Sequence, residues 1–142
     1  MNYLNKILFL NSANIPYAEV ALNGNVHFIG TQGVGKSTLL RALLFFYNAD
    51  KLKLGIPKEK RGFDAFYFPF ANSYIVYEVM REVGGAYCVL ALKVQGRVAF
   101  RFIDAPFDRR WFMDDAGYVF SDWVRIRERI DKKTMISRIV NS

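Results

Sequence analysis

The chain has 142 residues, 52% of them apolar, and a formal net charge of +7. This length fits one domain, and the apolar fraction excludes a disordered chain, while the positive charge suits an anionic partner such as a nucleotide or nucleic acid. Cys88 is the single cysteine, which excludes an intrachain disulfide and a thiolate metal cluster. We expect no membrane span, since no apolar run reaches the required length, and we predict a cytoplasmic location.

Three strands are predicted in the first part of the chain. Residues 3–10 and 17–22 are strand-like, and Asn23-Gly24 is a strong hairpin signal between the second strand and a third over 26–29. Two strands, paired through at least one antiparallel turn, therefore precede the strand that leads into the next motif.

The motif that follows is a glycine-rich loop with the sequence G-T-Q-G-V-G-K-S, from Gly30 to Ser37 and followed by Thr38. It lies between a strand-like run and a predicted helix over 37–46, which is the setting of a P-loop. Glycines allow the backbone to approach a phosphate closely, and the helix N-terminus favours an anion. We predict that Lys36 acts as the catalytic lysine on the β- and γ-phosphates and that the Ser37 hydroxyl ligates Mg²⁺.

Two segments without a regular pattern come next. Residues 48–62 are rich in lysine and arginine and are broken by Gly55 and Pro57. This pattern indicates an exposed loop, with phosphate contact as the alternative. Residues 63–71 are aromatic and favour packing over a stacking platform for bases.

The second half of the chain predicts three more strands and a helix. The strands cover 73–83, 86–94 and 97–103, and their short connections allow only antiparallel pairing. A helix from Asp122 to about Lys132 follows, with Ser121 as its predicted N-cap and a basic exposed side.

These residues together resemble the N-terminal part of an SMC-like, condensin-type ATPase head of the ABC class. The similarity covers about residues 3–104, including the run S-Y-I-V-Y-E-V, and is most specific at the P-loop together with the strands on both sides of it. It implies an α/β P-loop NTPase fold, the N-terminal lobe of an ABC/SMC head with a mixed, largely antiparallel sheet around the P-loop helix. Residues 1–142 would be this lobe in a longer protein, with 105–142 as a helical segment leading toward further parts.

The resemblance also implies a function and a set of site residues. The full-length protein would bind ATP and Mg²⁺ between two heads, hydrolyse ATP and act on DNA in chromosome organisation, repair or defence. Phe100 to Asp104 only imitates a Walker B strand, and the catalytic glutamate and signature motif are expected outside this sequence, so this chain alone would be nearly inactive. The implied cofactor-binding residues are Gly30, Thr31, Gln32, Gly33, Val34, Gly35, Lys36, Ser37, Thr38, Asn11, Ser12 and Arg61.

Two other functions fit a P-loop, because the loop itself does not choose the reaction. One is a small phosphotransferase that acts on a nucleoside or metabolite, with the 51–61 loop as its acceptor site. The other is a non-catalytic module that binds nucleotide or DNA. The preference between ATP and GTP stays open.

Overall fold

The computed structural model describes residues 2–22, 27–30, 34–47, 62, 64–130 and 136–138. Its helices are α1 (Lys36–Tyr47), the 3-10 helix η2 (Arg109–Trp111) and α3 (Trp123–Arg129), and a further helical turn covers 64–67. Its strands are β1 (Tyr3–Ser12), β2 (Ile15–Ala21), β3 (His27–Gly30), β4 (Tyr74–Met80), β5 (Ala86–Val94), β6 (Arg97–Ile103) and β7 (Ile136–Arg138).

The described strands form one seven-stranded sheet in the order β3-β2-β1-β4-β5-β6-β7. Each neighbouring pair in this sheet is antiparallel. The predicted P-loop NTPase fold, the N-terminal lobe of an ABC/SMC head, is therefore wrong, because that arrangement requires a parallel core. β3, which leads into the glycine-rich loop, lies at the edge of the described sheet and pairs only with β2 there.

The predicted hairpins are confirmed where the structure describes them. β4, β5 and β6 pair as an antiparallel meander, with Glu78 opposite Cys88 and Ala91 opposite Phe100. Gly84, Gly85 and Gly96 have positive φ values of 100°, 79° and 79°, which suit glycine at tight turns. The Asn23-Gly24 turn lies outside the described residues.

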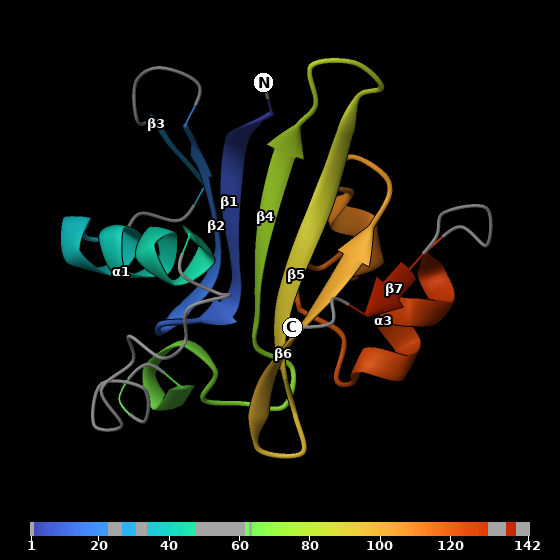
Figure 1. Ribbon diagram of the computed structural model, residues 1–142. Coiled ribbons are helices and arrows are strands. Elements are labelled where there is room, and N and C mark those ends of the chain that lie inside the picture. The colour runs from blue at the N-terminus through green and yellow to red at the C-terminus, as the bar shows by residue number, and fades with distance from the viewer. Residues whose placement is uncertain are drawn as a thin grey trace.

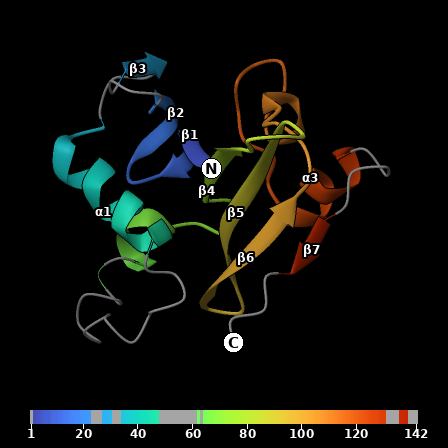
Figure 2. The ribbon, with the colours of Figure 1, turned by 45° about the horizontal axis from the view of Figure 1, so that its top comes forward.

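Helices cover both faces of the sheet, so the molecule has three layers (Figures 1 and 2). Successive residues of a strand point to opposite faces. Ile7 and Phe9 accordingly belong to the core under α1, whereas Leu8 and Leu10 belong to the core under η2 and α3. The central strands β1, β4 and β5 are largely buried on both faces, which explains their nearly continuous apolar sequences.

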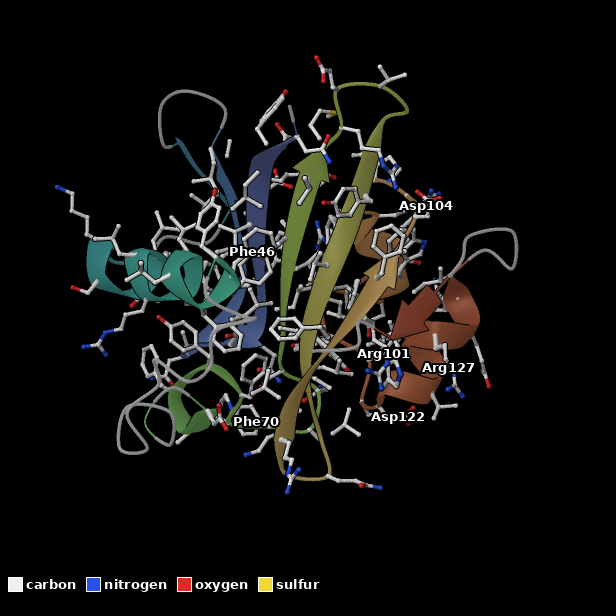
Figure 3. The ribbon with its side chains drawn as sticks, in the orientation of Figure 1. Phe46, Phe70, Arg101, Asp104, Asp122 and Arg127 are labelled. Atoms are coloured by element: carbon white, nitrogen blue, oxygen red, sulfur yellow. The ribbon has the colours of Figure 1, made fainter. Side chains whose placement is uncertain are left out.

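On one face, α1 packs its inner side against the sheet. Leu39 and Ala42 are buried there, as are Tyr67 and Phe68 at the end of the 64–67 turn. Phe46 lies on the inner side of α1, with its ring 4.5 Å from the ring of Tyr77 in β4 (Figure 3). Among the described residues of the aromatic stretch over 63–71, Tyr67 and Phe68 belong to the core, while Phe66 and Phe70 are 40% and 57% exposed.

On the other face, η2 and α3 cover the sheet. Trp111, Phe112, Ile126 and Ile130 are buried in this core. The predicted N-cap of α3 is wrong by one residue, because Asp122 rather than Ser121 accepts a hydrogen bond from the Arg125 backbone N–H, at 2.9 Å. Within the described parts of the chain, no helix has the length and apolarity needed to cross a membrane.

Candidate functional site

The glycine-rich loop joins β3 to α1. Gly30 is the last residue of β3, and α1 begins at Lys36, so the predicted transition from strand through loop to helix is confirmed at both ends. Val34 is buried against the core under α1 and anchors the end of the loop. Thr31, Gln32, Gly33 and Arg61, all predicted to contact nucleotide, lie outside the described residues, as do residues 48–61 of the basic loop.

The first two residues of α1 are turned outward. Lys36 and Ser37 are both exposed, and neither makes an ion pair or a side-chain hydrogen bond with a described residue. The Gly35 carbonyl accepts the Leu39 N–H at 3.0 Å, which closes the first turn of the helix. The partial positive charge of a helix N-terminus therefore lies beside an exposed ammonium group and an exposed hydroxyl, a combination that suits phosphate oxygens.

Gly35 provides a test of whether the loop leaves room for a ligand. A Cβ atom added to Gly35 would meet no atom within 4 Å, and its φ is outside the left-handed region. The described fold therefore does not itself require glycine at this position. Open space beside the backbone is what close approach of a phosphate group requires, so the residues present fit such a group.

A single tyrosine, Tyr67, connects the last residue of β1 to the start of α1. The Tyr67 hydroxyl donates a hydrogen bond of 2.6 Å to the Thr38 carbonyl. The Tyr67 carbonyl in turn accepts a hydrogen bond of 2.7 Å from the Ser12 hydroxyl. Burial raises the pKa of Tyr67 to about 12, although the positive charge of Arg41 acts in the opposite direction. Tyr67 therefore stays protonated and holds the first turn of α1 against the sheet.

The structure places Asn11 and Ser12 in this supporting network. The Ser12 side chain is fully buried, and its proton is used in the bond to Tyr67. The Asn11 side-chain amide donates to the Asn72 Oδ1 at 2.9 Å, and the Asn11 carbonyl accepts from the Ser73 hydroxyl at 2.6 Å. Of the two predicted nucleotide-contacting residues, Ser12 is thus connected to α1 through Tyr67, whereas Asn11 is bonded to Asn72 and Ser73 just before β4.

A second tyrosine holds the middle of α1. The Tyr77 hydroxyl donates a hydrogen bond of 2.8 Å to the Ala42 carbonyl. Complete burial raises the pKa of Tyr77 well above its ordinary value, so this bond also persists at neutral pH. The roles of Tyr67 and Tyr77 could not be predicted from the sequence, because hydrophobic periodicity does not indicate which group a tyrosine hydroxyl contacts.

The described residues hold few candidate metal ligands. No group of three or more histidine, cysteine, aspartate or glutamate side chains comes together among the described residues. Asp104, at the end of the Walker B-like stretch, is exposed and pairs with Arg81 at 2.8 Å. It lies just after β6 and away from α1 (Figure 3). Ser37, the predicted Mg²⁺ ligand, is the second residue of α1.

The fold and the loop define an antiparallel sheet between two helical layers, with a glycine-rich loop that leads into the helix on one face. Residues 14–136 match the family described as "Protein of unknown function (DUF3584)". The chain belongs to this family. No curated protein and no solved structure matches it.

Proposed function

We propose that this chain binds ATP through Gly30 to Thr38, with the phosphate groups at the N-terminus of α1. The observation that carries this proposal is the G-x-x-x-x-G-K-S sequence, whose last two residues are the exposed first two residues of α1. A glycine-rich turn that arose by chance would rarely combine this glycine spacing with a lysine, a hydroxyl residue and the start of a helix.

Each residue of the site has a defined part in this proposal. The Lys36 ammonium would neutralise the β- and γ-phosphates, and the Ser37 hydroxyl would hold Mg²⁺. Mg²⁺ prefers six oxygen ligands and usually takes several from water and phosphate, so one protein hydroxyl is sufficient in this kind of site. When bound, Mg²⁺ supplies charge neutralisation on the phosphate oxygens.

The proposal extends to an SMC-like ATPase in the full-length protein. There, ATP hydrolysis would be coupled to DNA organisation, repair or defence, and two such proteins would pair head to head around the nucleotide. The support is the similarity of residues 3–104 to such ATPases. The net charge of +7 agrees with a polyanionic partner.

The proposal rests on the loop and not on the architecture of the sheet. The antiparallel sheet removes the support that a parallel core would have provided. Function is determined by a site rather than by a fold, and the groups that bind phosphate here are backbone N–H groups, Lys36 and Ser37.

Binding of ATP to the full chain, measured by isothermal titration calorimetry with Mg²⁺ present, tests the proposal. We expect Lys36→Ala to weaken binding at least about tenfold, since it removes a charge-assisted contact. Lys93→Ala, at the far end of β5, is the matched control and should leave the affinity unchanged. Unmeasurable ATP binding by the wild-type chain, or equal affinities for wild type and Lys36→Ala, would overturn the proposal.

A second variant separates folding from binding. Gly35→Ala adds a Cβ atom that meets nothing within 4 Å in the described structure, so the variant should fold normally. If a phosphate group approaches the backbone at this point, the same methyl group should lower the ATP affinity. Unchanged affinity in Gly35→Ala would show that the nucleotide does not approach Gly35.

A further inference from the structure

The outer side of α1 is apolar although it faces solvent. Leu40, Leu44 and Tyr47 lie on successive turns and are 56%, 59% and 66% exposed. The inner side of the same helix is apolar too, because Leu39 and Ala42 are buried against the sheet. A helix that covers a sheet usually presents polar residues outward. We call the exposed residues Leu40, Leu44 and Tyr47 the α1 ridge.

A cleft of about 800 Å³ continues this surface at the C-terminal end of α1. Tyr47 belongs to both the α1 ridge and the cleft, so the two form one surface. Leu4 and Val79 from the sheet also line the cleft, together with the aromatic rings of Tyr3, Phe46 and Tyr87. Tyr3 is itself 50% exposed. The cleft is wide enough to receive a large apolar side chain.

The charge beside the α1 ridge has one sign. The charged residues of α1 are Lys36 and Arg41, both are exposed, and the helix contains no acidic residue. Neither side chain makes an ion pair with a described residue. A surface that combines exposed apolar residues with positive charge that no described residue pairs fits a partner that is apolar on one side and acidic at the edges of that side.

We propose that the α1 ridge and the cleft bind an acidic amphipathic helix of another protein. The apolar side of that helix packs along Leu40, Leu44 and Tyr47, one of its large side chains enters the cleft, and its carboxylates face Arg41 and Lys36. This is the helix-in-groove mode of recognition. The ridge spans roughly 10 Å along the axis, at 1.5 Å per residue, so three to four turns of a partner helix cover the ridge and the cleft.

Charge argues against a second copy of this chain as the partner. In a two-fold pair of antiparallel α1 helices, Arg41 near the middle of the helix would lie close to Arg41 of the other copy, and each chain has a net charge of +7. Like charges placed opposite one another cost free energy and suppress the wrong partner. The inference shares Lys36 with the proposed ATP site, and it otherwise rests on the α1 ridge, the cleft and Arg41.

Two synthetic helical peptides test the inference. They share one apolar seam, and they differ in carrying either glutamates or lysines beside it. Fluorescence anisotropy with the full chain should show that the glutamate peptide binds at least about tenfold more tightly than the lysine peptide. Leu40→Ser should weaken binding of the glutamate peptide by about tenfold, since it removes apolar area from the contact. Val124→Ser, a control at a half-exposed position of α3, should change nothing.

A charge reversal makes the test specific. Arg41→Glu should reduce or invert the preference between the two peptides without unfolding the chain, because Arg41 is exposed. Equal binding of both peptides, or no binding of either, would overturn the inference. Self-association in sedimentation experiments that Leu40→Ser abolishes would identify a second copy as the occupant, and binding to anionic vesicles but not to the peptides would identify a membrane. Loss of ATP binding with intact peptide binding would overturn the proposed function alone.

Discussion

α1 and α3 cover opposite faces of the same sheet, but they differ in how polar their solvent-facing sides are. α3 turns Ile126 inward and presents Arg125 and Arg129 to solvent, as an amphipathic helix does. α1 is apolar on both sides, with Leu40 56% and Tyr47 66% exposed. The outer side of α3 therefore carries mostly charged residues with Val124 half-exposed, whereas the outer side of α1 presents a continuous apolar ridge.

The two helices are also attached by different forces. α3 is held by apolar side chains that enter the core, such as Ile126 and the adjacent Ile130, and by an exposed hydrogen bond of 2.8 Å from Arg129 to the Arg110 carbonyl. α1 combines the burial of Leu39 and Ala42 with hydrogen bonds from two buried tyrosines to its own carbonyls. Hydrogen bonds fix direction as well as distance, so they hold the start of α1, where Lys36 lies, in one orientation.

The largest expected effect is at the centre of the α3 face. Ile126→Ala should lower the free energy of unfolding by about 2–5 kcal/mol, because the side chain is fully buried and its removal leaves a cavity. The matching change on α1, Leu40→Ala, should stay within about 0.5 kcal/mol, since more than half of that side chain already contacts water. Chemical denaturation monitored by circular dichroism measures both. Equal losses for the two variants would show that the α1 ridge is packed in solution.

The next effect compares two buried tyrosines of β4 that point to opposite faces. Tyr77→Phe should cost about 1–2 kcal/mol of unfolding free energy, because the Ala42 carbonyl loses its donor in a buried position. Tyr74→Phe is the matched control, since the Tyr74 hydroxyl is buried and has no hydrogen-bond partner among the described residues. Its removal should be neutral or slightly stabilising. A larger loss for Tyr74→Phe than for Tyr77→Phe would contradict the attachment of α1 described here.

The N-terminus of α3 provides a test with a smaller expected effect, because two adjacent residues are candidates for its N-cap. Asp122→Ala should lower the free energy of unfolding by about 1 kcal/mol, because the carboxylate accepts the Arg125 N–H. Ser121→Ala should change it by less than about 0.5 kcal/mol. The same denaturation measurement applies to both variants. A larger loss of unfolding free energy for Ser121→Ala than for Asp122→Ala would show that Ser121 is the N-cap, as the sequence pattern predicts.

What could be predicted from sequence was local. The β4–β5 and β5–β6 hairpins follow from short turns at Gly84-Gly85 and Gln95-Gly96, where glycine φ values are positive. A helix after the loop, predicted over 37–46 from the change of pattern, is present and extends one residue further at each end, over Lys36–Tyr47. The choice between Ser121 and Asp122 could not be made, since both are good caps and only the backbone geometry decides.

The part that could not be predicted depends on contacts between distant residues. β1 pairs with β2 on one side and with β4 on the other, and no local pattern near Tyr3–Ser12 names β4 as the second neighbour. The P-loop sequence led to the expectation of the fold that usually carries it, although the same loop can end a strand of another kind of sheet. The bonds from Tyr67 and Tyr77 to α1 join residues 29 and 35 positions apart, which sequence alone cannot reveal.

The smallest expected effect is the response of the α1 face to alkaline pH. The folded-state pKa of Tyr67, about 12, is above the ordinary value of 10.0, chiefly because of burial. A group whose pKa is raised by folding contributes stability that is complete below the unfolded-state value and is lost as pH rises through the folded-state value. The free energy of unfolding should therefore fall between about pH 10 and pH 12.

Tyr67→Phe isolates the contribution of this one residue. Ionisation of Tyr67 would remove the proton that it donates to the Thr38 carbonyl, so wild type should lose stability in this pH range faster than the variant. The variant lacks one titrating hydroxyl, and the other buried tyrosines titrate in both proteins. The slopes of unfolding free energy against pH should therefore differ by at most about one proton per molecule. Denaturation curves at several pH values between 9 and 12 measure it, with Tyr3→Phe as a control at an exposed position. Parallel curves for wild type and Tyr67→Phe would mean that the Tyr67 hydroxyl contacts water, and the hydrogen bond that holds the first turn of α1 would then have to be abandoned.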